Sequence, residues 1–440
     1  MRSPRFDTVV VGAGPAGSVA ALILARAGAR VALVDKSSFP RDKACGDLVG
    51  PRGVGLLTQL GLDDADVLTL GDMVVVGPTG GRSLLPALPG LAYPGEAWSV
   101  PRTRFDARLC EAAITAGAEP VTARVGDLEP GPSGAAGVRL DDGTTIEGDF
   151  VIGADGATSR VAAAAGLVDP DRVLWGFAIR AYLQQSVHLP YIAFWDPTPG
   201  HAFPGYGWLF PGPDGRANAG LGLGTGSDRR GGARAAQQLD SFLDHLHRLG
   251  LLTSAADGSR RGRLGGWLKM GMVGTVPARG RVLLVGDAAG LVNPLQGEGI
   301  AQAMDSGRAA ALAVVGQPGD AAGRYLAHLR RTHVPYQATT AGIHTTLVSR
   351  PRLVSAVGRA LTTPAAGRAL GGGWGVYWNG LLEGAAPGRA RRVARIADGT
   401  ARLLTVQAGA RRWLRSALDQ PGPAGPVAPT PEGSPVSSRT

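Results

Sequence analysis

The chain has 440 residues, of which 44% are hydrophobic and 18% charged, with a net charge of +10 and only two cysteines, Cys45 and Cys110. This composition excludes a wholly disordered chain, a disulfide framework and a cysteine-rich metal site. We find no signal-peptide pattern and no apolar run of roughly 18 residues that would span a membrane, so we expect a cytoplasmic protein of two or three domains.

The N-terminal segment predicts a strand–helix–strand unit. Phe6–Val11 is a short apolar run typical of a buried parallel strand. Pro15–Ala27 is rich in alanine and begins with a proline, which the first turn of a helix tolerates. Arg30–Val34 predicts the second strand, so the unit is a βαβ motif.

A glycine-rich turn, Gly12-Ala13-Gly14-Pro15-Ala16-Gly17, joins the first strand to the helix. Gly12 permits the tight turn, Gly14 lets backbone amides approach a pyrophosphate, and Gly17 lets the helix pack closely on the sheet. Asp35 ends the second strand, where its carboxylate can accept hydrogen bonds from a ribose. The contacts predicted for a dinucleotide in this segment are Gly12, Gly14, Ala16, Gly17, Asp35 and Lys36.

The next part of the chain alternates short strands and helices. Ser37–Pro51 has turn chemistry and predicts a long loop. The elements expected after it are helix Val54–Leu60, strands Met73–Val76 and Ser83–Leu85, helix Arg102–Ala116, a β-meander over Val121–Ile146, the buried strand Phe150–Gly153, a sheet over Leu174–Leu223, and helix Ala233–Leu249.

A second segment with nucleotide chemistry follows the buried strand Arg281–Val285. Asp287 comes directly after this strand, where its carboxylate can meet a ribityl hydroxyl. The turn Gly297–Gly299 and Ile300 open a predicted helix, Gly299–Val315, whose amides can face the N1–C2=O edge of a flavin. Together with the first segment, this pattern favours FAD over NAD.

Four further motifs, in this order, carry a resemblance to a known family: Phe39-Pro40-Arg41-Asp42-Lys43-Ala44-Cys45-Gly46-Asp47, Val100-Pro101-Arg102-Thr103-Arg104-Phe105-Asp106, Gly153-Ala154-Asp155-Gly156-Ala157-Thr158-Ser159, and Tyr206-Gly207-Trp208-Leu209-Phe210-Pro211 with Gly220-Leu221-Gly222. Across about residues 6–315 the chain resembles the geranylgeranyl reductase family, within the larger group of FAD enzymes that includes the aromatic hydroxylases. The motifs are more specific for the family than for the reaction.

The resemblance implies roles for residues in these motifs. Its flavin-side residues are Cys45, Gly46, Arg102 and Asp155. Its catalytic candidates are Cys45, Tyr206 and Trp208. Tyr206, Trp208 and Phe210 alternate along a predicted strand and share one face, which either walls an apolar cavity over the flavin or forms ordinary sheet core.

Cys45 has two readings, a gating or proton-donating group beside the flavin or simple flavin-side packing. Arg41 and Lys43 are its neighbours in the loop, and we expect them to lower its pKa. Cys110 lies on a predicted amphipathic helix and is expected in the core.

One position departs from the pattern of the related hydroxylases, D-G-x-x-S-x-x-R, because Ala162 stands where they have arginine. In those enzymes the segment helps to bind both FAD and NADPH. The source of electrons therefore stays open, either NAD(P)H or another reductant.

The predicted fold class is α/β, with a doubly wound FAD-binding domain, an inserted antiparallel-sheet substrate domain and a C-terminal helical region. The expected bounds are 1–70, 98–165 and 275–320 for the FAD-binding domain, 71–97 and 166–274 for the substrate domain, 321–418 for the helical region, and 419–440 for a disordered tail.

Two enzyme functions fit this reading. The first is reduction of a carbon–carbon double bond in a hydrophobic isoprenoid substrate, as the resemblance to the reductases implies. The second is oxygen-dependent epoxidation or hydroxylation of a terpenoid or polyketide-like substrate on the same scaffold. A third reading is a flavin-binding protein without catalysis of its own.

The C-terminal third carries most of the excess charge, with 15 arginines and two acids between Arg324 and Arg415. Arg389–Arg415 mixes arginines with apolar residues at helical spacing, which favours peripheral contact with the inner face of a membrane, the alternative being a solvated helix. Aromatic residues do not interleave with this basic run, so no nucleic-acid partner is expected. The histidines are scattered along the chain, and no metal site is predicted.

Overall fold

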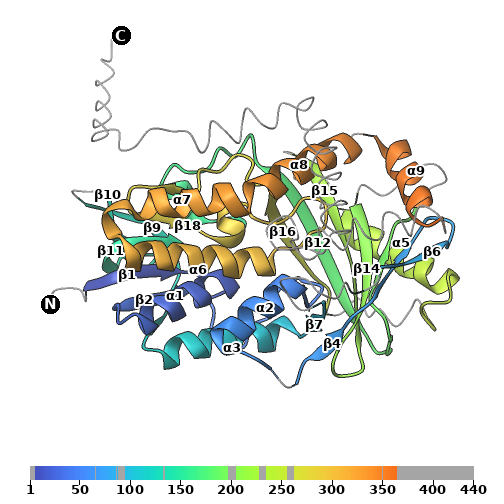
Figure 1. Cartoon of the computed structure of the whole chain (residues 1–440), viewed down its shortest axis with the longest axis horizontal. Coiled ribbons are helices and arrows are strands. Elements are labelled where there is room, and N and C mark those ends of the chain that lie inside the picture. Colours follow the sequence, from blue (N-terminus) through green and yellow to red (C-terminus); the bar gives the residue numbers. More distant parts are fainter. Residues whose placement is uncertain are drawn as a thin grey trace, which may run out of the picture.

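The fold is described from a computed structural model, which covers residues 5–363 apart from 65, 86, 88–94, 132–133, 197–204, 227–233, 255–261 and 349. Two sheet-based units lie side by side along the long axis of the molecule, and helices of the C-terminal part run across both of them (Figure 1). Of the helical region predicted for 321–418, residues 364–418 lie outside the described residues, and so does the predicted tail 419–440.

The first unit is built on an eight-stranded sheet. Its strands are β1 (Arg5–Val11), β2 (Val31–Asp35), β8 (Glu119–Thr122), β9 (Val125–Gly131), β10 (Gly134–Leu140), β11 (Thr145–Gly153), β17 (Ala278–Arg279) and β18 (Val282–Leu284). β8, β2, β1, β11 and β18 pair in parallel, while β9, β10 and β17 add antiparallel strands. The carboxyl ends of β1, β2, β11 and β18 therefore meet at one edge, which is where ligands bind in such sheets.

Helices cover this sheet and fix the nucleotide turns. They are α1 (Pro15–Arg26), α2 (Pro51–Leu60), α3 (Arg102–Thr115), α4 (Arg160–Ala164), α6 (Ile300–Gly316) and α7 (Ala321–Thr332), with the short turns η2 (Gly286–Ala289) and η3 (Pro318–Asp320). α1 and α6 approach so closely that a Cβ on Gly307 would lie 2.1 Å from the carbonyl oxygen of Ala16. Small residues at this crossing bring the N-termini of both helices to the same edge of the sheet.

The second unit is a seven-stranded sheet. In spatial order its strands are β16 (Leu264–Met270), β12 (Leu174–Leu183), β15 (Ala217–Gly226), β14 (Gly205–Pro211), β13 (Tyr191–Ala193), β5 (Met73–Val76) and β6 (Arg82–Leu85). Neighbours pair antiparallel except β13 and β5, which are parallel, and the β5–β6 hairpin comes from an earlier part of the chain. Helix α5 (Ala235–Arg248) packs on one face through Leu239 and Phe242, so the other face turns toward the first unit.

A small sheet and the C-terminal helices complete the described fold. The sheet consists of β3 (Leu48–Val49), β7 (Ala97–Ser99) and β4 (Leu68–Leu70). The predicted loop over Ser37–Pro51 therefore contains a two-residue strand, β3, which forms because it pairs with β7. Helices α8 (Val334–Val348) and α9 (Pro351–Leu361) reach the second unit. Among the described helices, none is both long and apolar enough to cross a membrane.

Candidate active site

The glycine-rich turn after β1 leaves the backbone amides at the N-terminus of α1 unobstructed. Gly12 has a φ of +101°, and a Cβ there would lie 2.3 Å from the carbonyl oxygen of Ala154, so the turn requires glycine. A Cβ on Gly17 would lie 1.8 Å from the carbonyl oxygen of Gly12. A Cβ on Gly14 would meet, among described atoms within 4 Å, only Nη2 of Arg41 at 3.5 Å. The uncapped helix N-terminus at Gly14 thus offers its amides to a pyrophosphate.

Asp35 lies beside this turn. Its two carboxylate oxygens accept hydrogen bonds from the backbone amides of Ala13 at 2.8 Å and Ser37 at 2.9 Å. Carboxylate oxygens carry further lone pairs, so the group can still accept hydrogen bonds from ribose hydroxyls. Ala16 is buried against α6, and the neighbouring Lys36 is exposed.

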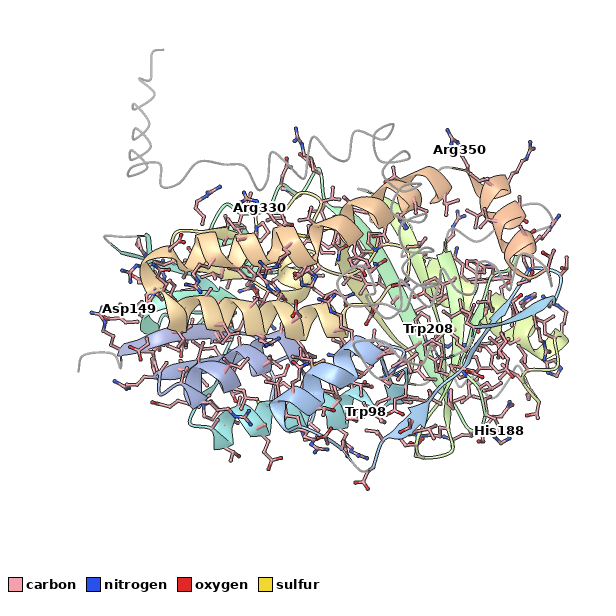
Figure 2. The ribbon with its side chains drawn as sticks, in the orientation of Figure 1. Trp98, Asp149, His188, Trp208, Arg330 and Arg350 are labelled. Atoms are coloured by element: carbon pink, nitrogen blue, oxygen red, sulfur yellow. The ribbon has the colours of Figure 1, made fainter. Side chains whose placement is uncertain are left out.

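The Cys45–Gly46 loop packs directly against Trp208 and Phe210, two of the aromatic side chains of β14. A Cβ on Gly46 would lie 2.9 Å from the ring of Phe210 and 3.3 Å from Nε1 of Trp208. Trp208 is buried in the interior between the two units (Figure 2). Glycine at 46 therefore lets the loop backbone approach the aromatic wall.

A buried polar network, missed by the sequence analysis, holds this loop. Asn218 donates to the carbonyl oxygen of Cys45 at 2.8 Å and to Asp47 at 2.9 Å, and accepts from Nε1 of Trp208 at 2.9 Å. Asp47 also accepts from the hydroxyl of Tyr182 at 2.5 Å. Burial raises the pKa of Asp47, and the hydrogen bonds from Tyr182 and Asn218 oppose that rise. Asp47 closes the loop motif in the sequence, but nothing local indicates its partners on β12 and β15.

The expectation that Arg41 and Lys43 lower the pKa of Cys45 is wrong. Burial raises the pKa of the Cys45 thiol, and the cation that partly opposes this effect is Arg102. Arg41 and Lys43 are each paired with a carboxylate, at 3.1 and 3.6 Å. Cys45 therefore lines the cavity as a protonated thiol at neutral pH.

Arg102 begins α3 beside this thiol. Its guanidinium makes a bidentate pair with Asp106, with both nitrogen–oxygen distances at 2.7 Å. Burial works against the charge, but the carboxylate of Asp106 outweighs burial and raises the pKa of Arg102. Cys110, on the same helix, is buried in the core as predicted.

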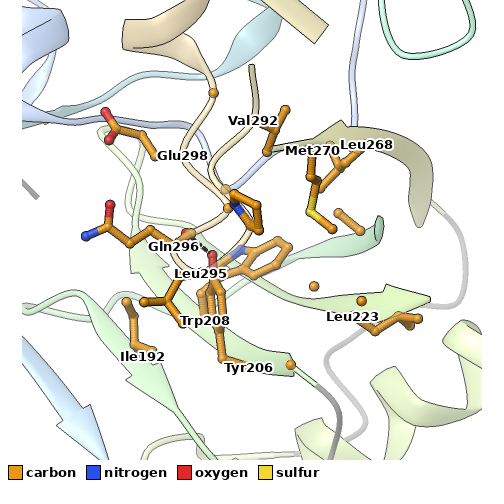
Figure 3. Close-up of a pocket in the computed structure, with 18 of the residues that line it drawn as sticks. Ile192, Tyr206, Trp208, Leu223, Leu268, Met270, Val292, Leu295, Gln296 and Glu298 are labelled. Atoms are coloured by element: carbon orange, nitrogen blue, oxygen red, sulfur yellow. Dashed lines mark hydrogen bonds between the residues drawn. The ribbon is translucent and has the colours of Figure 1, made fainter. Parts of the chain in front are cut away.

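The second nucleotide segment faces β14. Asp287 follows β18 in η2 and lies 3.6 Å from Nζ of Lys43. Gly297 has a φ of +66°, and a Cβ there would lie 2.5 Å from the hydroxyl oxygen of Tyr206. Figure 3 shows that Tyr206 donates to the carbonyl oxygen of Gln296, which ties the turn to the sheet.

The turn continues directly into α6. Gly299 is the N-cap of α6 and provides no side-chain cap, and Ile300 is the first helical residue. The amides of this helix N-terminus therefore point into the same region as those of α1, and both are suited to negatively charged parts of a flavin dinucleotide.

A cavity of about 540 Å³ lies between these turns and the second sheet. The turn at 297–300, the Cys45–Gly46 loop, Tyr206 and Trp208 all line it, and Figure 3 shows Tyr206 in contact with the turn. Apolar side chains of α8 and α9, including Leu347 and Val354, close another part. The predicted placement of the aromatic residues on one cavity wall agrees with this geometry.

Comparisons with known proteins identify the family. A family model described as an FAD binding domain matches residues 5–173. The chain is 38% identical over 317 residues to the menaquinone reductase of Mycolicibacterium smegmatis, covering 70% of this chain and 76% of that protein. It is 34% identical over 315 residues to digeranylgeranylglycerophospholipid reductase 2 of Methanopyrus kandleri, with coverage of 70% and 76%.

The chain belongs to the geranylgeranyl reductase family. It is an FAD-dependent oxidoreductase, and the predicted fold class is confirmed. A solved geranylgeranyl bacteriochlorophyll reductase-like protein from Thermoplasma acidophilum has the same fold, with a TM-score of 0.68, 20% identity, and coverage of 84% of this chain and 96% of that one. A flavin-dependent brominase shares it as well, at a TM-score of 0.68 and 15% identity, with coverage of 92% and 100%.

Asp155, a predicted flavin-side residue, makes local hydrogen bonds at the start of α4. The carboxylate of Asp155 accepts hydrogen bonds from the hydroxyl of Ser159 at 2.5 Å and from the amides of Arg160 at 2.6 Å and Val161 at 3.2 Å. It thus caps α4 and does not line the cavity, although its backbone lies against Gly12.

The side chains of Asp305, His328 and His333 lie close together, and none of the three lines the cavity. Nε2 of His328 and Nε2 of His333 lie 2.9 and 2.7 Å from the same carboxylate oxygen of Asp305. They form the kind of group that can hold a metal ion, which the scattered histidines of the sequence did not indicate. Arg52 lies 3.4 Å from that oxygen, so the protein itself already balances the carboxylate charge.

Proposed function

We propose that this oxidoreductase reduces a carbon–carbon double bond of an isoprenoid held in the apolar cavity. The observation that carries the proposal is that the cavity is lined both by the turn 297–300 of the FAD-binding unit and by the aromatic strand of the second sheet. The reductase names of the relatives, which concern a prenylated quinone and prenylated lipids, support the same direction.

The chain's own residues shape and close the site. A bound FAD, once reduced, would supply a hydride to the double bond. Trp208 and Tyr206 are each fixed by a hydrogen bond, to Asn218 and to the carbonyl of Gln296, so the wall keeps its form around a flexible chain. Double-bond reduction also needs a proton, and Cys45 holds one on Sγ at the cavity wall because burial raises its pKa.

Two further parts of the proposal concern the electron donor and contact with a membrane. We propose that a reduced nicotinamide or another small reductant loads the flavin from solution. The basic segment Arg389–Arg415, which lies outside the described residues, is our proposed contact with an anionic membrane that stores isoprenoid lipids. Co-sedimentation with anionic vesicles, weakened by salt and lost on truncation before Gly388, tests that contact.

Anaerobic turnover tests the reaction itself. The FAD-loaded protein is reduced with dithionite, oxygen is excluded, and farnesol or a prenylated naphthoquinone is added. The naphthoquinone product is reoxidised in air before its mass is measured, so that reduction of the quinone ring is not counted. We expect a gain of two hydrogens, and a Trp208→Ala variant should raise the KM for longer prenyl chains more than for shorter ones. A product that gains one oxygen atom, and forms only when air is admitted, would show a monooxygenase instead.

A further inference from the structure

Glu298 places a carboxyl group at the turn that opens α6. It is the middle residue of the turn Gly297–Gly299, whose amides we expect at the N1–C2=O edge of the flavin, and it lines the cavity. Figure 3 shows its side chain directed away from Tyr206 and Trp208. The carboxyl group therefore lies apart from the aromatic rings, and no role was expected for it from the sequence.

This carboxyl group has one hydrogen-bond partner and one oxygen without a partner. Oε2 accepts a hydrogen bond at 3.3 Å from Nε2 of Gln302, which lies one helical turn further along α6. Oε1 of Glu298 and Oε1 of Gln302 are both buried, and neither has a hydrogen-bond partner among the described residues. Two adjacent side chains thus contain unpaired acceptors, and a proton on the carboxyl group would supply the donor that they lack.

Gln302 suits both protonation states of Glu298. Its amide nitrogen donates to the carboxylate, as the structure shows. Rotation of the amide by half a turn would bring its oxygen to the same position, where it accepts a hydrogen bond from a protonated carboxyl group. Oε2 of Glu298 therefore keeps a hydrogen-bond partner whether or not it carries a proton.

The surroundings leave Glu298 close to its titration point. Burial raises the pKa of Glu298 to about 7, and the charge of Arg52 on α2 opposes this rise only in part. Arg52 lies 3.4 Å from the carboxylate of Asp305, so its charge is shared between two acids. Tyr206, the titratable group that interacts with Glu298 from β14, stays protonated because burial raises its pKa.

Reduction of the bound flavin changes this balance. Two electrons and one proton leave a net negative charge on the flavin, at the N1–C2=O edge. A like charge disfavours a neighbouring carboxylate, so the pKa of Glu298 should rise by about one to two units.

We propose that Glu298 takes up a proton when the bound flavin is reduced and releases it when the flavin is reoxidised. Above about pH 7 each reduction then takes two electrons and two protons, of which one proton goes to the flavin and one to the carboxylate of Glu298. In turnover a hydride leaves the flavin for one carbon of the double bond, and the proton that Glu298 releases balances the proton added to the other carbon. This last step rests on the proposed function, whereas the uptake of the proton does not.

The pH dependence of the flavin midpoint potential tests the proposal, measured on the FAD-loaded full chain without substrate. A two-electron couple that binds two protons has a slope against pH twice that of a couple that binds one. We expect the one-proton slope below about pH 7, where Glu298 is already protonated in the oxidised protein, and a slope about 1.5 to 2 times as steep over the next one to two pH units. Protonation of the reduced flavin itself would steepen the slope toward low pH instead.

Two variants locate the proton. Glu298→Gln keeps the shape of the side chain and removes its titration, so the one-proton slope should extend over the whole range. The control Glu147→Gln removes an exposed carboxyl group of β11 and should keep the steep region. A steep region that persists in Glu298→Gln overturns the proposal, and so does an unaltered protein whose slope stays at one proton or steepens only toward low pH.

Infrared difference spectra of the unaltered protein give a test that needs no variant. Reduction above pH 7 should add the C=O stretching band of a protonated carboxyl group, and this band should shift in D2O. Its absence would overturn the proposal even if Glu298→Gln failed to bind FAD.

The two proposals fail separately. Proton uptake by Glu298 without reduction of any prenyl double bond would support the role of Glu298 and remove the proposed function. Reduction of the double bond by a protein with the one-proton slope throughout would do the reverse.

Discussion

Substitution of Asn218 by alanine tests the network that positions the Cys45–Gly46 loop. Asn218 is 3% exposed and makes three hydrogen bonds, to Trp208, Asp47 and the backbone of Cys45. Each buried partner that loses its hydrogen bond costs roughly 1–3 kcal/mol. Asp47 keeps its hydrogen bond from the hydroxyl of Tyr182, so its loss lies at the lower end of this range. We therefore expect the free energy of unfolding to fall by about 3–5 kcal/mol in total.

Urea unfolding followed by tryptophan fluorescence, with FAD held in excess, measures this loss. Because Asn218→Ala removes one hydrogen bond from the Trp208 side chain, its effect should be smaller in a Trp208→Phe background, where that bond is already absent. A loss below about 1 kcal/mol in the single variant, on the scale of a single hydrogen bond, or strict additivity of the two variants, would refute the reading of these residues as one network.

Three further outcomes follow from the geometry. Gly14→Val should abolish FAD binding, because its side chain would fill the space above the α1 amides, while Gly319→Val, in open space, should leave the flavin content unchanged; a flavin-loaded Gly14→Val protein would disprove the dinucleotide site. Cys45→Ser should lower turnover more than FAD content, and equal turnover would leave Cys45 as packing alone. Burial lowers the pKa of His333, so the unfolded chain takes up a proton that the folded chain resists, and the free energy of unfolding should fall as pH drops below about 6.5. His333→Gln should make that fall shallower, and an unchanged slope in chemical denaturation at pH 7 and 5 would contradict the assignment.

The nucleotide-binding turns could be predicted from sequence because their constraints are local. Gly12 has a positive φ of +101°, and a Cβ on Gly17 would lie 1.8 Å from the carbonyl oxygen of Gly12, so both glycines are required within the turn itself. The alternating aromatic residues of β14 likewise follow from the two-residue period of a strand, which places Tyr206 and Trp208 on one face. In both cases the structural constraint involves only a few consecutive residues.

Other parts of the site arise from contacts between distant segments. Asp47, Tyr182 and Asn218 come from three separate parts of the chain and meet only when the second sheet packs on the loop. Leu347 reaches the cavity because α8 packs on the loop before α6, where Gln337 donates to the carbonyl oxygen of Leu291. A single sequence contains no period or spacing that relates such residues, so their partners could not be predicted.

Cys45 shows most clearly how packing overrides proximity in sequence. Arg41 and Lys43 are its nearest cations along the chain, yet each is drawn to a carboxylate. Arg102 takes their place at the thiol, but its charge is largely balanced by the bidentate pair with Asp106, so burial decides the pKa. A thiol that keeps its proton is better suited to a reductive site than a thiolate, because a thiolate would add a second negative charge beside a reduced flavin and would have no proton to give to the substrate carbon.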